Sequence, residues 1–135
     1  MFAIIPVKML VNSKKRLASI LTIGERVRLS ETMLLDVLHA VCNSSISKVI
    51  VVSNDEKIIK IARDFSATIV VEEKELGVNS AVALTDSICK DCDASIVIPQ
   101  DLPFILPIDI DMICNSAMSK RCVVITPSYR YDGTN

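Results

Sequence analysis

The stretch Lys48-Val-Ile-Val-Val-Ser53 is a short run of β-branched residues, which predicts a strand buried on both faces. Asp55 follows this stretch and can cap a helix over residues 56–64, and residues 67–72 are again apolar enough to form a strand. Two parallel strands need a crossover connection, which a helix usually supplies. The region therefore predicts an α/β fold with a parallel sheet.

The same alternation continues on both sides of this region. Upstream, the pattern predicts a strand over residues 2–7 and a helix that runs from a capping box, Thr22 to Glu25, to about Cys42. Downstream, it predicts a helix over residues 80–90 and a strand over residues 94–98. A helix capped by Asp109 then runs to about residue 119, and a last strand covers residues 121–126. We expect a three-layer α/β domain over residues 1–135, with a mainly parallel sheet and helices on both faces.

The charge of the chain is distributed unevenly. Its formal net charge is −1, but residues 1–30 carry +5 and the remaining residues carry −6. Because the chain after residue 30 is acidic, the chain as a whole is a poor electrostatic match for a nucleic acid, and no charge-free apolar run reaches the ~18 residues that cross a bilayer. We therefore expect no nucleic-acid or membrane partner, and the basic start of the chain suits a small anion.

The five cysteines predict reduced thiols in a cytoplasmic protein. The first positive charges come after the apolar N-terminal stretch, which is the reverse of their order in a signal peptide. Cys89-Lys-Asp-Cys92 has the spacing of a redox or zinc motif, but it falls at the predicted end of a helix, where a thiolate is not activated. We interpret these cysteines as structural.

A group of basic residues follows the first strand: Lys8, Lys14, Lys15 and Arg16. Parallel sheets bind ligands beyond the carboxyl ends of their strands, and cations at the start of a short helix would attract several phosphate charges. The alternative interpretation is a solvated basic turn. The chain lacks the glycine spacing of a P-loop and of a dinucleotide fold, which argues against both classes.

Two further loops carry candidate groups. Asp101 lies in the loop after the fourth strand, where a carboxylate could hold magnesium against phosphates; an ordinary Asp-initiated turn is the alternative. The stretch Asp132-Gly-Thr-Asn135 could be an ordinary turn, or it could offer backbone N–H groups to an anion. The single histidine, His39, falls within a helix, far in sequence from these loops, and we interpret it as a packing or surface residue.

Six short stretches, in order along the chain, resemble the 2-phospho-L-lactate guanylyltransferases. They are Ile5-Pro-Val-Lys8, Lys14-Lys-Arg-Leu17, Val51-Val-Ser-Asn-Asp55, Gly77-Val-Asn-Ser-Ala81, Pro99-Gln-Asp-Leu-Pro103 and Gly133-Thr-Asn135. This family shares a nucleotidyltransferase fold with the molybdenum-cofactor guanylyltransferases and the sugar-nucleotide pyrophosphorylases. The resemblance therefore implies a Rossmann-like fold of the nucleotide-diphospho-sugar transferase type.

The resemblance also implies a reaction. GTP would react with 2-phospho-L-lactate, or with phosphoenolpyruvate, to give a guanosine diphosphate conjugate and pyrophosphate in coenzyme F-420 biosynthesis, with Mg2+ and as a homodimer. The implied roles are triphosphate binding by Lys8, Lys14 and Arg16, guanosine contacts by Ser53, Asp55 and Asn79, magnesium binding by Asp101, and acceptor-phosphate contacts by Gly133 and Thr134. Lys14, Arg16 and Asp101 would be the catalytic set.

Members of this family continue past the Gly-Thr-Asn motif, so we expect that the chain lacks a C-terminal part of the domain. Two alternatives stay open. One is a nucleotidyltransferase on the same fold that uses another nucleotide or acceptor. The other is a nucleotide-binding module without catalysis.

Overall fold

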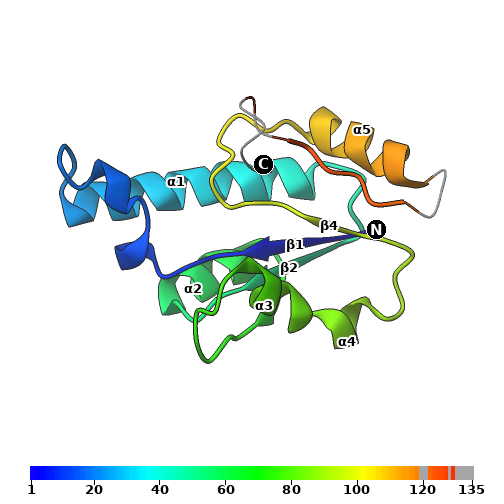
Figure 1. Ribbon diagram of the computed structural model, residues 1–135, viewed down its shortest axis with the longest axis horizontal. Helices are drawn as coiled ribbons and strands as arrows, with labels where there is room; N and C mark the ends of the chain where they lie inside the picture. The colour runs from blue at the N-terminus through cyan, green and yellow to red at the C-terminus, as the bar shows by residue number, and fades with distance from the viewer. Residues whose placement is uncertain (119–121, 128, 130–135) are drawn as a thin grey trace.

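The computed structural model describes residues 1–118, 122–127 and 129, and its centre is one four-stranded parallel sheet (Figure 1). The strand order is β3-β2-β1-β4, and each neighbouring pair is parallel. The strands are β1 (Phe2–Pro6), β2 (Lys48–Val52), β3 (Thr68–Val70) and β4 (Ser95–Val97). The first four predicted strands and their parallel arrangement are confirmed.

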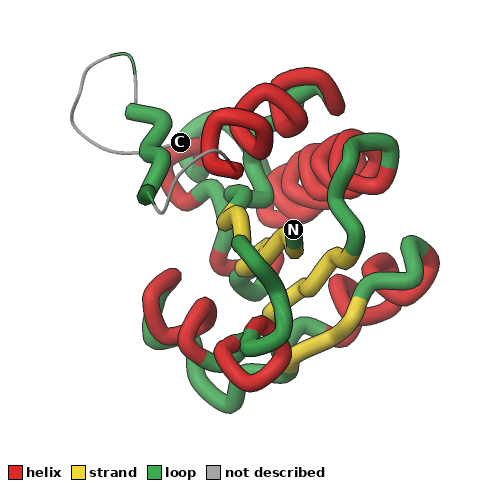
Figure 2. The backbone as a smooth tube through the Cα atoms, turned by 90° about the vertical axis from the view of Figure 1, so that its right-hand side faces the viewer, coloured by secondary structure: helices red, strands yellow, loops and turns green. Residues whose placement is uncertain are grey.

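Helices cover both faces of the sheet. They are α1 (Ile23–Cys42), α2 (Glu56–Asp64), α3 (Val78–Ala83), α4 (Asp86–Cys89) and α5 (Pro107–Met118), with the 3-10 turns η1 (Leu10–Asn12) and η2 (Lys15–Leu17). Buried residues of α1, α2 and α5 share one apolar cluster with Ala3 and Ile5, whereas Ile4 packs with α3 in a second cluster. This alternation along β1 confirms the three layers, and Figure 2 shows helices on both sides of the strands.

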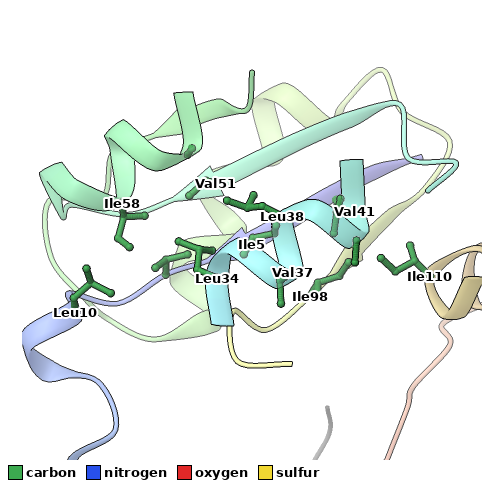
Figure 3. Close-up of a cluster of buried hydrophobic side chains, with 14 of the residues drawn as sticks. Ile5, Leu10, Leu34, Val37, Leu38, Val41, Val51, Ile58, Ile98 and Ile110 are labelled. Carbon is green, nitrogen blue, oxygen red and sulfur yellow. The ribbon is translucent and has the colours of Figure 1, made fainter. Parts of the chain in front are cut away.

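The larger cluster holds α1 firmly against the sheet (Figure 3). Its four central side chains on α1 follow helical spacing and have no exposed surface: Leu34, Val37, Leu38 and Val41. They pack with Ile5 and Val51 from the two central strands. Each side chain of this kind stabilises the fold by ~1.5–3 kcal/mol when it is fully buried. The loop that joins β1 to α1 is therefore held between two rigid elements.

The predicted starts of α1 and α2 are confirmed in detail. The Thr22 hydroxyl accepts a hydrogen bond from the Glu25 amide at 3.3 Å, and the Glu25 carboxylate accepts one from the Thr22 amide at 2.8 Å. The bonds from Thr22 lower the pKa of Glu25. At α2, the Asp55 carboxylate accepts a hydrogen bond from the Lys57 amide at 3.0 Å.

The helix predicted over residues 80–90 is wrong, because the structure has two short helices there. The first begins earlier, at Val78, and the second begins at Asp86. Thr85, between them, is buried, and its amide and hydroxyl both donate hydrogen bonds to the Val82 carbonyl, three residues back. This tight turn interrupts the regular bonds of an α-helix, which reach four residues back.

The predicted cap of α5 is also wrong. The helix begins at Pro107, so Asp109 lies in its first turn and accepts a hydrogen bond from the Leu106 amide at 2.9 Å. Proline favours the first helical position because its φ is already helical and it has no N–H to satisfy.

The predicted fifth strand is absent from the residues that the structure describes between 122 and 126. Arg121, its expected first residue, lies outside the described residues. Val123 is 87% exposed, whereas a strand of a parallel sheet normally has both faces covered. Among the described residues, no helix has the length and apolar character needed to cross a membrane.

Candidate functional site

The order of the strands indicates where this fold can bind a ligand. The chain passes outward from β1 to β2 and β3, and then returns to place β4 on the other side of β1. In open parallel sheets, ligands bind beyond the carboxyl ends of the strands at the point where this direction reverses. Here that point lies between the loop after β1 and the loop after β4.

An ion pair joins these two loops. Lys14 Nζ donates a hydrogen bond to Asp101 Oδ2 at 2.6 Å, although the two residues are 87 positions apart in the sequence. Their side chains are 21% and 46% exposed, so water reaches the pair. A pair of this kind contributes only ~0–1 kcal/mol to stability. An anion and a cation from solution could therefore replace the two partners at small cost.

The loop that carries Asp101 offers oxygen atoms of the type that magnesium prefers. Asp101 supplies a solvent-exposed carboxylate, and the amide oxygen of the preceding Gln100 is buried without a hydrogen-bond partner. Magnesium in proteins commonly binds one or two carboxylates and fills its other positions with water and phosphate. The part of the chain that the structure describes holds no group of three His, Cys, Asp or Glu ligands. A single carboxylate is enough for a magnesium ion whose other ligands are water and phosphate oxygens.

The other basic residues lie around the loop after β1. Lys8 and Arg16 are exposed, and Arg16 lies in η2, a 3-10 turn of only three residues. A single 3-10 turn has almost no dipole of its own, so the expected contribution of a helix start is not present. The positive charge of this loop comes from its side chains alone.

Two of the residues implied to contact guanosine make hydrogen bonds within the protein. Asp55 Oδ1 caps α2, and its Oδ2 accepts a hydrogen bond from the Leu10 amide at 2.9 Å. Ser53 has no exposed surface, and its hydroxyl accepts a hydrogen bond from the Asp55 amide at 3.2 Å. In this conformation the pair connects η1 to the start of α2. Asn79, the third residue of the set, is exposed on α3.

Two acidic residues beyond β3 were missed by the sequence interpretation. Glu72 and Glu75 line a small cavity of about 30 Å³, together with Lys8 and the start of α3. Glu72 is only 5% exposed; its burial raises the pKa of its carboxyl, and the charge of Glu75 raises it further, while Lys8 opposes the shift. The available signal was an acidic residue directly after an apolar strand, at the edge where ligands bind.

A larger groove of about 930 Å³ runs beside β4. Its walls come from β4 and the loop after it, from α5, and from residues 122–126, with Asn79 at its rim. Val78 lines both this groove and the small cavity. The volume is within the range of small-molecule sites. The loop that carries Asp101 thus lies between the basic loop and a space of ligand size.

The remaining candidates lie outside this crevice or outside the described residues. Gly133 and Thr134 are not among the described residues. His39 is exposed on α1, where its ring meets the ring of Phe65 edge-on at 4.8 Å, as a packing residue would. Cys89 ends α4 as expected, and burial raises the pKa of the Cys92 thiol, which disfavours a reactive thiolate.

Comparison with protein families assigns the chain. A family model described as "Guanylyl transferase CofC like" matches residues 1–135. The chain belongs to this CofC-like guanylyl transferase family. This result confirms the resemblance drawn from the six short stretches.

Curated relatives in this family carry names of two acceptor types. The chain is 35% identical, over its whole length, to the phosphoenolpyruvate guanylyltransferase of Roseiflexus castenholzii. It is 34% identical, over 98% of its length, to the 2-phospho-L-lactate guanylyltransferase of Methanothermobacter thermautotrophicus. The chain spans 61% and 59% of the lengths of these two relatives.

Solved structures confirm the fold of the family member. A Desulfovibrio desulfuricans protein assigned as a nucleotide-diphospho-sugar transferase superposes with a TM-score of 0.76 at 12% identity, over 96% of this chain and 58% of that one. A CMP:2-keto-3-deoxy-manno-octonic acid synthetase superposes with a TM-score of 0.58 at 13% identity, over 93% and 50% of the two chains. These likenesses confirm the Rossmann-like fold of the nucleotide-diphospho-sugar transferase type.

Proposed function

We propose that this chain forms the nucleotide half of a guanylyltransferase. The enzyme would join GTP to the phosphate of 2-phospho-L-lactate or phosphoenolpyruvate and release pyrophosphate, as a step in coenzyme F-420 biosynthesis. The observation that carries the proposal is the meeting of Lys14 and Asp101 at the reversal point of the sheet. Family membership and the names of the relatives supply the substrates.

The reaction needs alignment and charge neutralisation more than proton transfer. An oxygen of the acceptor phosphate forms a bond to the α-phosphorus of GTP. The bond between that phosphorus and the oxygen that bridges it to the β-phosphorus breaks, and pyrophosphate leaves. The acceptor oxygen is already ionised at neutral pH, so no general base is required. Lys8, Lys14 and Arg16 would bind the triphosphate and stabilise the charge that develops on the leaving group.

Asp101 would hold the magnesium ion, which supplies further charge neutralisation when it is bound with GTP. Binding of the complex would replace the Lys14–Asp101 contact, since Lys14 would then face phosphate and Asp101 would face the cation. The exposed, weak pair suits such an exchange of partners.

The acids beyond β3, buried Glu72 and half-buried Glu75, would contact the guanine base. Guanine presents two adjacent donors, the ring N1–H and the 2-amino group, which a carboxylate can accept together, whereas adenine has no such pair. Glu72 is held at the cavity beside Lys8 and the start of α3. Asn79, exposed on the same helix, would contact the nucleoside, and Ser53 and Asp55 would support the loop from behind.

A homodimer in the cytoplasm completes the proposal. In the loop after β4 and in α5, large apolar side chains are exposed: Phe104 by 91%, Leu106 by 57%, Ile108 by 60% and Met112 by 63%. Exposed apolar side chains that gather in one region of the surface commonly mark a protein interface. We propose that a second subunit covers this patch.

The reaction is tested by pyrophosphate release from GTP with each acceptor, using the protein that the gene encodes. We expect the wild type to require magnesium, and Asp101→Asn to lower kcat/KM by a factor of about 100 or more, because a metal ligand stabilises transition-state charge by several kcal/mol. Asp64→Asn, an equal change at an exposed position that ends α2, is the control and should keep full activity.

Three outcomes would contradict the proposal. Full activity of Asp101→Asn would remove the metal role from this residue. Pyrophosphate release from CTP in preference to GTP would instead assign the chain to another nucleotidyltransferase on the same fold, and GTP binding without release would identify a binding module.

A further inference from the structure

Arg26 is a charged residue that the reaction does not use, and its position in the fold is unusual. It lies in the first turns of α1 and is only 7% exposed. Among the described residues it forms no ion pair with a carboxylate, and its Nε is buried without a hydrogen-bond partner. Burial of a charge without an opposite charge is costly, so the hydrogen bonds that the guanidinium does make must offset part of this cost.

Its hydrogen bond goes to the backbone of the basic loop. Arg26 Nη1 donates to the carbonyl oxygen of Ser13 at 2.8 Å, and this bond is buried. A second residue of α1 also holds Ser13, since the hydroxyl oxygens of Ser13 and Ser30 lie 2.6 Å apart. Two side chains of one rigid helix therefore attach to the residue that directly precedes Lys14.

The other end of this short loop is attached as well. The Ser13 hydroxyl donates to the Leu10 carbonyl at 2.7 Å, and the Leu10 amide donates to the Asp55 carboxylate at 2.9 Å. The segment from Leu10 to Ser13 is thus connected to α1 and to the start of α2 by buried or half-buried bonds. The loop leaves this connected segment at Lys14.

Lys14 has a backbone conformation that needs such support. Its φ is 52° and its ψ is 35°, in the left-handed region, which costs a residue other than glycine ~1 kcal/mol or more. The Ser13 carbonyl belongs to the peptide plane that leads into Lys14. A hydrogen bond that holds this peptide plane in place also restricts the φ angle that Lys14 can adopt. It therefore helps to direct the Lys14 side chain toward Asp101.

We propose that Arg26 is a positioning residue that holds the Ser13–Lys14 peptide so that Lys14 points into the crevice. The inference rests on the proposed function only in assigning the GTP triphosphate as the anion that Lys14 meets. Arg26 makes its contact through the loop backbone and does not need to touch the substrate. Its buried charge also adds to the positive potential behind the loop.

A measurement without nucleotide tests the positioning. Trypsin cleaves after lysine and arginine, so cleavage after Lys14, Lys15 and Arg16 reports how ordered the loop is. We expect Arg26→Met to speed this cleavage several-fold in the native protein. The control is Arg28→Met, which removes the same charge from an exposed position on the same helix and should leave the rate unchanged.

A double-mutant cycle separates positioning from a general loss of stability. We expect Arg26→Met to weaken binding of magnesium-GTP about tenfold, or ~1.4 kcal/mol, in the wild-type background. In the Lys14→Met background the same change should have less than about a twofold effect, because Arg26 acts through Lys14. Arg26→Lys should recover part of the affinity, because an ammonium group can still donate one hydrogen bond to Ser13.

These experiments distinguish a failure of the Arg26 inference from a failure of the proposed function. If the wild type does not bind GTP, the proposed function fails, but the trypsin measurement still tests the inference. Unchanged cleavage in Arg26→Met, or equal losses of affinity in both backgrounds, would overturn it. If Arg26→Met does not fold, Arg26→Lys provides both measurements, with smaller changes expected in the same direction.

Discussion

At the scale of single residues, the site contains charges of both signs that have weak partners or none. Lys14 and Asp101 pair in contact with water, and Glu72 is held beside a second acid, where burial raises the pKa of its carboxyl. Groups that cost stability in a free protein can gain favourable interactions when a ligand supplies complementary charge or donors. Because Glu72 is a buried carboxyl of this kind, we expect it to influence which nucleotide binds.

Glu72→Gln should change which base the protein prefers. A carboxylate accepts hydrogen bonds from both N1–H and the 2-amino group of guanine, but an amide offers one acceptor and one donor group. We expect weaker binding of GTP, and stronger binding of xanthosine triphosphate, whose 2-oxygen can accept from the amide. Isothermal titration with GTP, inosine triphosphate and xanthosine triphosphate measures the change.

The matched control for this prediction is Glu73→Gln, which makes the same change at an exposed neighbouring position. This variant should keep the wild-type order of affinities. A Glu72→Gln protein that binds all three nucleotides as the wild type does would exclude Glu72 from base recognition.

At the scale of elements, the first turn of α1 combines a local cap with the support of the basic loop. Thr22 and Glu25 satisfy backbone groups at the helix start, while Arg26 and Ser30, on the buried side, hold Ser13. Fraying of this turn would therefore affect both the helix and the loop that carries Lys14. If Lys14 binds the triphosphate as proposed, the stability of this turn would also affect binding.

The cap makes stability depend on pH in a defined direction. Hydrogen bonds from Thr22 lower the pKa of Glu25 below its ordinary value of 4.5, so the ionised form stabilises the folded state. This contribution is fully present above pH 4.5 and is lost as the pH falls through the pKa of the folded state. We expect Glu25→Gln to unfold at lower urea concentration than the wild type at pH 7, and the two curves to converge at low pH.

Glu56→Gln, at an exposed position in the first turn of α2, controls for the general effect of an acid near a helix start. It should show a smaller difference from the wild type at pH 7 than Glu25→Gln does. A constant gap between Glu25→Gln and the wild type at all pH values would mean that ionisation of Glu25 does not stabilise the cap.

At the scale of the whole molecule, the two regions with a proposed function meet at the loop after β4. One region, beyond the carboxyl ends of β1 and β4, holds the charged crevice. Another, formed by the loop after β4 and by α5, exposes the apolar patch around Phe104. Both include the loop after β4, which connects the proposed metal position with the proposed subunit interface.

The patch leads to a prediction about assembly. The encoded protein should be a dimer by light scattering, and Phe104→Asp should shift it toward a monomer, because a charge would be buried in an apolar contact. Tyr129→Asp changes another aromatic residue that is 97% exposed and should leave the dimer intact. A wild-type protein that is monomeric at high concentration would contradict the proposed homodimer.

Local sequence patterns predicted much of the fold because strands, helix faces and helix caps depend on residues that are close in sequence. The apolar runs of β1 to β4, the spacing along α1 and the capping box at Thr22 all follow from neighbouring positions, and the structure confirms them. The helix over residues 80–90 was wrong because buried Thr85 makes a tight turn that apolar spacing does not reveal. The start of α5 was wrong because the proline preference at Pro107 outweighed the capping preference of Asp109.

The candidate site was only partly open to such prediction. Sequence placed charged residues after the right strands, because the carboxyl edge of a parallel sheet follows from the order of its elements. By itself it determined the α/β class, the basic loop and the family motifs. Only the tertiary structure brought Lys14 to Asp101, turned Ser53 and Asp55 inward, buried Arg26 behind the loop and placed Glu72 at a cavity. The physical reason is that such contacts join residues far apart in sequence, so packing of the whole sheet and its helices decides them.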